Sequence, residues 1–520
     1  MIKHRAAILA ALFLFGQSLG IGQAAAQDVT FLSRDGSVEV SGTLLGFDGE
    51  YYRVDTLYGE LTVDSSGVIC DGPGCPDLTS YVAELELSGA AAMGRVLLPA
   101  LIEGFGLKYG YTVERKDLEP TRTEYRLTEG DRIAGVFRIH SSNTDEGFAD
   151  LLANEADMVM ALREMRPDER ERAQDAGMGD LRSVGRSRVL ALDALVPIVA
   201  PGNPVTALTV PQLSDVLAGK VTNWQQLGGP DAPIDVHLRD GASGFGQATV
   251  DRLLSPVGEA LSPGATRHDS DALLIRAVMR DPFALGVISL SELREAVPVA
   301  LSGACGFTLR PTRRNAKTED YPLVLPVFLY LPARRLPKLG REFLAYTRSS
   351  AAQLVIRRVG YVDQAPEEVP INMQGDRFAN AIARAGEEVP LQELQRMVGR
   401  LTPMKRLTTS FRIEAGSSDL DAQSRSNILQ LADALESGDY DGRELLFVGF
   451  SDGEGPAGPN REIAQRRAQV VYDAIVTAAE TFDPTRTQLS VEAFGEAMPM
   501  ACDDSAWGRQ VNRRVEVWLR

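Results

Sequence analysis

Residues 208–220 read LTVPQLSDVLAGK, and this stretch sets the expected fold of the middle of the chain. Thr209 is suited to cap a helix, and Gln212 completes a capping box three residues later. Gly219 is placed to end the helix. The predicted buried face consists of three apolar residues at helical spacing, Leu213, Val216 and Leu217. The stretch therefore predicts one amphipathic helix of a folded domain.

The segments on both sides alternate between strand-like and helix-like patterns. ALDALVPIVAPGNPV and IDVHLRD flank the helix, and ALLIRAVMRDPFALGVISL and YPLVLPVFLYL follow it. The alternation runs from about residue 82 to residue 363. It predicts an α/β region that is long enough to divide into two lobes.

The rest of the chain divides into shorter parts. Residues 28–78 show short alternating runs broken by DG turns, which predict a small β domain. From Arg406 the predicted order β-α-β-α-β indicates an α/β sandwich. The predicted fold class is therefore multidomain α/β. Its predicted divisions are a signal peptide at 1–26, the small β domain at 27–78, the two-lobed domain at 79–363, a linker at 364–405 and the sandwich at 406–520.

Composition limits the kinds of partner that the chain can have. Of its 520 residues, 44% are hydrophobic and 24% are charged, as in ordinary globular proteins. The net charge of −17 would repel a polyanion over most of the surface, so nucleic acid is excluded as a partner. Any anion site is expected to be a local pocket.

The N-terminus is typical of a cleaved secretory signal. Lys3 and Arg5 precede an apolar run, and small residues precede the expected cut after Ala26. No later apolar run reaches the ~18 residues that a membrane span needs. The mature chain is therefore expected in the periplasm.

Export makes disulfides possible. Cys70 and Cys75 lie in CDGPGC, a short turn that can fold back on itself and predicts a bridge. Cys305 and Cys502 lie in different predicted domains. For these two, a bond and free thiols both remain open.

The stretch RDGASGF, residues 239–245, has the residue types of an anion site. Arg239 supplies a permanent charge. Ser243, in a Ser-Gly turn that opens a helix, supplies a hydroxyl and lies beside backbone N–H groups at the positive helix end. By itself, the stretch also fits an ordinary strand-to-loop turn.

No catalytic set is legible in the sequence. A nucleophilic serine elbow needs G-x-S-x-G, and here Phe245 occupies the last position. The histidines His140, His237 and His268 have no recognisable metal-site or triad companions. The chain is therefore expected to have no enzymatic activity, no metal site and no cofactor.

Residues 82–363 resemble the periplasmic phosphate-binding proteins of ABC transporters, which are PstS-like proteins with the type 2 periplasmic-binding-protein fold. The stretches that carry the resemblance include LSGAAAMGRVLLPAL, ANEADMVMALREMRPDE, LAGKVTNW, HLRDGASGF and SSAAQLVIRRVGYV, in family order. The resemblance implies that a small anion such as phosphate is captured between two lobes by hinge closure. It implies an anion site of Arg239, Ser243 and Gly244, with Ser141 and Ser142 at a further helix start.

Three positions depart from this family pattern. Residues 90–92 are all alanine where Ser or Thr is usual, Phe245 replaces a hydroxyl, and residues 161–163 read ALR where Ser plus Asp or Arg is usual. Each missing hydrogen bond to a charged ligand would cost ~1.5–3 kcal/mol. Arg163 is the residue expected to compensate.

A second pair of charges lies in residues 449–468, GFSDGEGPAGPNREIAQRRA. Asp452 can hold an ammonium group, and Arg467 can hold a carboxylate through two parallel hydrogen bonds. Asn460, between them, is suited to cap the helix that carries Arg467. By themselves, Asp452 and Arg467 fit a surface salt bridge worth ~0–1 kcal/mol.

The wider segment resembles the OmpA-like C-terminal domain, a peptidoglycan-binding module. That family has a G-H-T-D turn, an Asn, an L-S-x-x-R-A helix and a final N-R-R-V-E. This chain has GFSD at 449–452, Asn460, IAQRRA at 463–468 and NRRVE at 512–516. The resemblance covers nearly all of 406–520 and implies that Asp452 and Arg467 hold the diaminopimelate of a cell-wall peptide. Phe450 and Ser451 depart from the usual His and Thr.

Together these patterns predict a non-catalytic periplasmic binding protein that captures phosphate or a similar small anion and is anchored to peptidoglycan. A transporter permease or an envelope protein is a further expected partner, and the outer membrane is an open location. The alternative is an envelope scaffold or signalling protein whose lobed domain has lost anion binding and contacts a protein. The alanines at 90–92 together with Phe245 favour this alternative. A hydrolase is the least favoured interpretation.

Overall fold

The computed structural model describes residues 28–183, 185–332, 334–385, 388–413 and 419–520. The expected signal peptide, residues 1–26, lies outside the described residues. The chain divides into two compact units, Met1–Tyr81 and Val82–Arg520. Among the described residues, no helix combines the length and the apolar composition needed to cross a membrane.

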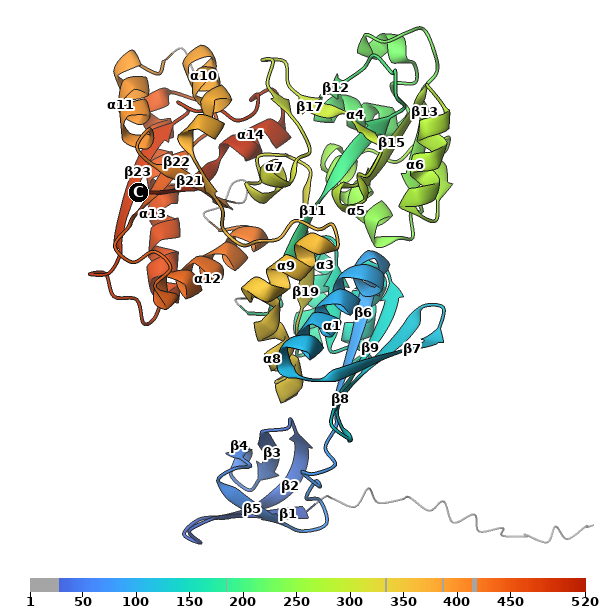
Figure 1. The fold of residues 1–520 in the computed structure, drawn as a ribbon, viewed down its shortest axis with the longest axis vertical. Helices are drawn as coiled ribbons and strands as arrows, with labels where there is room; N and C mark the ends of the chain where they lie inside the picture. Colours follow the sequence, from blue (N-terminus) through green and yellow to red (C-terminus); the bar gives the residue numbers. More distant parts are fainter. Residues whose placement is uncertain (1–27, 184, 333, 386–387, 414–418) are drawn as a thin grey trace, which may run out of the picture. The chain divides into compact units, whose positions relative to one another are not determined.

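The first unit is an antiparallel sheet of five strands in the order β4-β3-β2-β1-β5 (Figure 1). The alternation in the sequence places Phe31, Tyr52 and Val54 in a small buried core. Cys70 and Cys75 form a disulfide beside this core. The strands are β1 (Asp28–Ser33), β2 (Glu39–Phe47), β3 (Tyr51–Thr56), β4 (Gly59–Asp64) and β5 (Val68–Asp71).

The second unit begins with a large sheet in the order β14-β13-β15-β11-β19-β10-β6-β9-β8-β7, with β16 paired to β11. β11 (Ser187–Val199) and β19 (Val324–Tyr330) run through its centre and join the two lobes. The first lobe has β6 (Ala83–Ala90), β7 (Thr112–Glu119), β8 (Arg122–Glu129), β9 (Arg132–Ser142) and β10 (Met158–Ala161). The second lobe has β13 (Asp235–Arg239), β14 (Thr266–His268), β15 (Ala284–Ser289) and β16 (Val297–Pro298).

Helices cover both lobes (Figure 1). The first lobe carries η1 (Met93–Leu97), α1 (Leu98–Tyr109), α2 (Thr144–Leu152), α3 (Pro167–Asp175), α8 (Lys338–Thr347) and α9 (Ser350–Arg358). The second lobe carries α4 (Val210–Leu217), η2 (Trp224–Leu227), α5 (Gly244–Leu253), η3 (Ser255–Val257), α6 (Asp271–Arg280) and η4 (Leu290–Glu292). A small sheet of β12 (Ala207–Leu208), β17 (Ala300–Ser302) and β18 (Thr308–Leu309) and the helix α7 (Arg313–Lys317) complete this region.

Helix α4 forms as the sequence predicts. Thr209 and Gln212 make the reciprocal capping box, and Leu213, Val216 and Leu217 are buried. Trp224 is fully buried, and its indole N–H donates to the carbonyl of Phe283 at 2.8 Å. The LAGKVTNW stretch therefore acts through packing.

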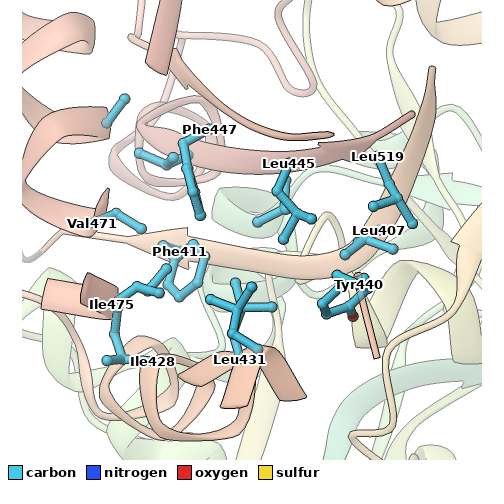
Figure 2. Packing of buried hydrophobic residues seen from close by; sticks show 14 residues of the cluster. Leu407, Phe411, Ile428, Leu431, Tyr440, Leu445, Phe447, Val471, Ile475 and Leu519 are labelled. Carbon is cyan, nitrogen blue, oxygen red and sulfur yellow. The ribbon is translucent and has the colours of Figure 1, made fainter. Parts of the chain in front are cut away.

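The C-terminal part is a sheet in the order β20-β21-β24-β22-β23 with helices on both faces. On one face, α12 (Ala422–Ser437) and α13 (Ala457–Ala478) bury Leu431 and Ile475 against Phe411 and Phe447 of the sheet (Figure 2). The remaining elements are β20 (Glu368–Val369), β21 (Lys405–Arg412), β22 (Glu444–Phe450), β23 (Gln488–Gly495), α14 (Ala506–Asn512) and β24 (Arg514–Leu519).

Residues 364–405, expected to be a linker, are instead part of this domain. They form β20, η5 (Ile371–Met373), α10 (Gly375–Arg384) and α11 (Leu391–Leu401). Met397 and Leu401 pack on the second face of the sheet. The helical pattern was visible in the sequence, but few residues of each helix are fully buried, and the polar, charged composition suggested a linker.

The C-terminal domain is fixed to the lobed region by covalent and ionic contacts. Cys305, between β17 and β18, forms a disulfide with Cys502. Arg406 of β21 donates to Asp320 at 2.7 Å, and both side chains are buried. The two parts therefore belong to one compact unit, which the sequence-based division did not anticipate.

Candidate functional site

Three charged residues converge at one edge of the C-terminal sheet. Asp452 follows β22, Arg467 lies in α13, and Arg513 precedes β24. Arg513 Nη1 donates to Asp452 Oδ2 at 2.8 Å, and the two side chains are 17% and 13% exposed. The carboxylate of Asp452 is therefore held in place by Arg513 rather than by Arg467.

Arg467 is half-buried beside this pair. Among the described residues, no carboxylate lies within ion-pair distance of its guanidinium. Burial and the neighbouring Arg513 lower the pKa of Arg467, while Asp452 acts in the opposite direction. An incoming carboxylate would relieve both unfavourable effects, so Arg467 is suited to bind an anionic group.

Asn460 does not cap α13. The helix begins three residues earlier, at Ala457, because Pro459 is tolerated in a first helical turn. The buried amide of Asn460 instead donates to Glu496 Oε2 at 2.6 Å and to the carbonyl of Gly455 at 3.3 Å. Asn460 therefore positions a carboxylate.

Two further carboxylates, which the sequence analysis did not select, lie near Asp452. Asp503 accepts from the backbone N–H of Gly453 and from Asn512, each at 2.8 Å. Burial and neighbouring acids, including Asp452, raise the pKa of Asp503 and of Glu496. A signal for Glu496 existed, because β22 and β23 are parallel and residues that follow them reach the same edge.

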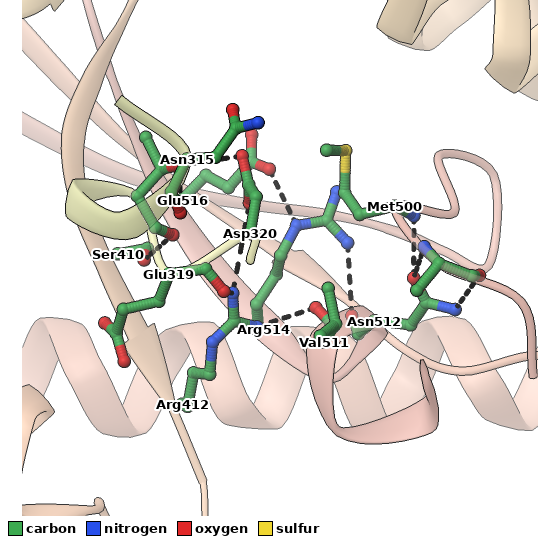
Figure 3. A network of polar contacts seen from close by, with 12 residues as sticks. Asn315, Glu319, Asp320, Ser410, Arg412, Met500, Val511, Asn512, Arg514 and Glu516 are labelled. Carbon is green, nitrogen blue, oxygen red and sulfur yellow. Dashed lines mark hydrogen bonds and ion pairs between the residues drawn. The ribbon is translucent and has the colours of Figure 1, made fainter. Parts of the chain in front are cut away.

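Arg514 has a structural role, although it adjoins Arg513 in the sequence. Its guanidinium is buried, lies 4.3 Å from the ring centroid of Phe450 and donates to Glu516 at 2.7 Å. Figure 3 shows it inside a network of polar contacts that includes Asn512 and Glu516.

The predicted anion site lies where α2 and α5 begin. Ser243 caps α5: its hydroxyl accepts from the N–H of Gly246 at 3.0 Å and donates to the carbonyl of Asp240 at 2.6 Å. Gly244 approaches the first lobe so closely that a Cβ there would lie 3.0 Å from the methyl of Ala90. The structure thus brings the two lobes together at the predicted site, and Ala90 occupies the point of contact.

The serines on the first lobe lie beside the start of α2. The Ser142 hydroxyl lies 3.4 Å from the carbonyl of Gly89, and Asn143 caps the helix by accepting from the N–H of Glu146. Ser141 is buried, and its N–H donates to the carbonyl of Thr121 at 2.7 Å. The start of α2 therefore offers backbone amides and weakly bonded hydroxyls, and its first turn also carries the acids Asp145 and Glu146.

Arg239 is paired with a carboxylate of its own lobe. Its guanidinium donates to Asp271 and, at 2.9 Å, to the carbonyl of Asp269. An anion would have to share this guanidinium with Asp271.

Arg163 has more carboxylate partners than Arg239. It donates to both carboxylate oxygens of Glu169, at 2.8 and 2.7 Å, and also to Asp145, and Asp251 lies 3.4 Å away. Burial acts to lower the pKa of Arg163, but Glu169 and Asp145 raise it above its usual value. Arg163 therefore stabilises the fold and offers little charge to a ligand.

Comparison with known proteins assigns both parts of the second unit. Residues 78–351 match the family model described as a PBP superfamily domain, which covers more than half of the chain. The chain belongs to the PBP superfamily. Residues 413–513 match the OmpA family.

The PBP-superfamily chain is similar to several known proteins over one part or another of its length. It is 24% identical over 195 residues to the phosphate-binding protein PstS of Borreliella burgdorferi, covering 36% of this chain and 70% of that one. It is 27% identical over 111 residues to outer membrane porin F of Pseudomonas aeruginosa, covering 21% and 30%. A solved ABC-type phosphate transport receptor from Vibrio cholerae aligns with a TM-score of 0.42 at 22% identity, covering 54% and 99%.

Among the described residues, no group of three or more potential ligands could hold a metal ion in this PBP-superfamily chain.

Proposed function

We propose that the chain is a non-catalytic binding protein of the cell envelope, whose OmpA-family domain binds peptidoglycan. The observation that carries this proposal is the half-buried Arg467, which has no carboxylate partner within the described part of the chain and lies beside the fixed pair Asp452–Arg513. The expected location is the periplasm, in association with peptidoglycan, and the porin relative favours a place near the outer membrane.

The positive charge of Arg467 and the negative charge of Asp452 together suit a ligand that carries both a carboxylate and an ammonium group. The free end of diaminopimelate carries an ammonium and a carboxylate on one carbon. Arg467 can bind that carboxylate through two parallel hydrogen bonds. Asp452, with Asp503 and Glu496 nearby, supplies the negative surroundings that an ammonium needs.

Co-sedimentation with isolated sacculi tests this function. Arg467→Gln and Asp452→Asn are each expected to weaken binding at least tenfold, because each removes a charge-assisted hydrogen bond. Arg466→Gln is the matched control, since Arg466 is the exposed neighbour on the same helix. Equal sedimentation of the wild type, Arg467→Gln and Arg466→Gln would refute the proposal.

For the PBP domain, we propose that the ligand is phosphate or a similar small anion, bound between the starts of α2 and α5. The named function of the PstS relatives and the N-terminal N–H groups of these helices support it. Binding would require α5 to move away from Ala90, with β11 and β19 as the hinge, because a Cβ on Gly244 already has no free space. A transporter permease is then the expected partner.

A second function for the PBP domain is contact with a protein partner of the envelope. The close approach of Gly244 to Ala90 and the pairing of Arg239 and Arg163 with carboxylates favour it. Thermal unfolding with added phosphate separates the two. A ligand at a hundredfold excess over its Kd stabilises by about 2.7 kcal/mol, whereas a scaffold would show no shift with phosphate or sulfate.

A further inference from the structure

A separate cavity of about 720 Å³ lies where the two lobes meet the OmpA-family domain. Met165 contributes from the first lobe, Arg252 from α5 of the second, and Phe328 from β19. Gln423 and Trp507 contribute from the OmpA-family domain. The volume is that of a small-molecule site. Its lining includes neither the Ser243–Gly244 turn nor the Asp452 cluster, and it shares with the predicted anion site only the segment of Arg163, whose guanidinium is paired with Glu169.

Arg252 lies half-buried on the cavity wall, where the acids Asp421, Glu164 and Glu319 act on it from beyond ion-pair distance. Among the described residues its guanidinium forms no ion pair, and its one hydrogen bond is a long contact of 3.5 Å from Nη2 to the carbonyl of Pro322. Its Nε is buried without a partner, and burial lowers the pKa of the group. A cation that is removed from water without a partner is unfavourable, so an anion in the cavity would compensate it.

Glu319 provides an unpaired acid on the same cavity. The residue is 8% exposed, and its Oε1 has no hydrogen-bond partner. Its φ is +53°, a left-handed conformation that is uncommon for a residue other than glycine and that recurs at ligand sites. Figure 3 shows the side chain turned away from the polar network, while its carbonyl accepts from Arg412.

The protonation state of Glu319 suits a hydrogen-bond donor. Burial, with Asp421 nearby, raises its pKa to about 8, although Arg412 and Arg252 act in the opposite direction. At neutral pH most molecules therefore carry the protonated acid, which can donate to a carboxylate. The nearby Gln423 has a buried Oε1 that also lacks a partner.

The rest of the wall is mixed: it carries further charged residues, among them Arg163, Arg412 and Asp421, beside an apolar part. Trp507 and Phe328 face the cavity from opposite sides of the domain boundary, together with prolines of the segment before and within β19. We propose that the cavity binds a small organic carboxylate, with its carboxylate on Arg252 and Glu319 and its apolar body against Trp507 and Phe328.

Thermal unfolding and tryptophan fluorescence of the full chain test this site with benzoate, phenylacetate and hexanoate as probes. Trp507 is one of three tryptophans, and it is the one that lines the cavity. The carboxylates are expected to raise the Tm and change the fluorescence, whereas the three corresponding amides should do neither. Phosphate should not compete with the carboxylates, because its proposed site lies elsewhere.

Arg252→Met is expected to weaken carboxylate binding at least tenfold, because it removes the cation that pairs with the carboxylate. Arg276→Met is the matched control, since Arg276 is exposed on α6. Glu319→Gly fits the left-handed backbone and should weaken binding about fivefold. The proposal is overturned if none of the three carboxylates stabilises the full chain, or if both variants keep wild-type affinity.

Discussion

Arg163 and Arg239 of the PBP domain and Arg467 of α13 were all predicted to bind an anionic group, but their surroundings differ. Arg163 and Arg239 each have carboxylate partners within their own lobe. Arg467 has none among the described residues and lies beside a second guanidinium, Arg513. A guanidinium whose partners belong to the fold stabilises the fold, and one that lacks them is available to a ligand.

The largest effect is expected when the carboxylate partner of Arg163 is removed. Glu169→Gln should lower the free energy of unfolding by about 3–5 kcal/mol, because it leaves a buried guanidinium without its two-oxygen partner. Urea unfolding measures the loss, and Glu171→Gln, at an exposed position of α3, is the control. A loss below about 1 kcal/mol would show that Arg163 is not structural.

The pH dependence of the free energy of unfolding tests the state of the buried acid Glu319. Its folded pKa of about 8 lies above the ordinary value of 4.5, so the folded state holds a proton that the unfolded state loses. Its contribution is present below pH 4.5 and is lost as the pH rises through about 8. Glu319→Gln should therefore flatten the fall in stability between pH 5 and 8 by about 3–4 kcal/mol. Identical pH profiles of unfolding for variant and wild type would contradict this.

Freeing Arg239 tests whether pairing is what limits anion binding. Asp271→Asn removes the negative charge that holds this guanidinium, so phosphate should bind about tenfold more tightly. Calorimetric titration measures the change, with the exposed Asp269→Asn as the control. Unchanged or weaker binding in Asp271→Asn would mean that Arg239 does not contact the anion.

The smallest effect is expected for the stability of Arg467→Gln. Because Arg467 makes no ion pair with any residue that the structure describes, the free energy of unfolding should change by less than about 0.5 kcal/mol. The same urea series used for Glu169→Gln measures it. A loss above about 2 kcal/mol would place Arg467 with the structural arginines.

The sequence predicted local elements and charged residue types better than it predicted partners. The capping box of α4 and the fold classes of the lobed and C-terminal domains are confirmed. Residues 364–405 were wrongly expected to be a linker, because their buried stripes are short. The pairing of Cys305 with Cys502 could not be chosen, since the bond crosses the expected domain division.

The contacts at the two candidate sites were also hard to predict, because their partners are distant in the sequence. Asp145, Glu169 and Asp271 are ordinary acids in the sequence, and only the folded chain brings them to Arg163 and Arg239. Asn460 was assigned to the wrong backbone position because Pro459 can stand inside a helical turn. Asp452 lies near Arg467, but its ion-pair partner in the structure is Arg513, which the sequence did not identify as that partner.

A crystal structure of the chain with a diaminopimelate-containing stem peptide tests the central claim most directly. The account predicts that the terminal carboxylate of diaminopimelate lies on Arg467 within hydrogen-bond distance and that its ammonium faces Asp452. A peptide bound elsewhere, or one that leaves Arg467 without a contact, would contradict it.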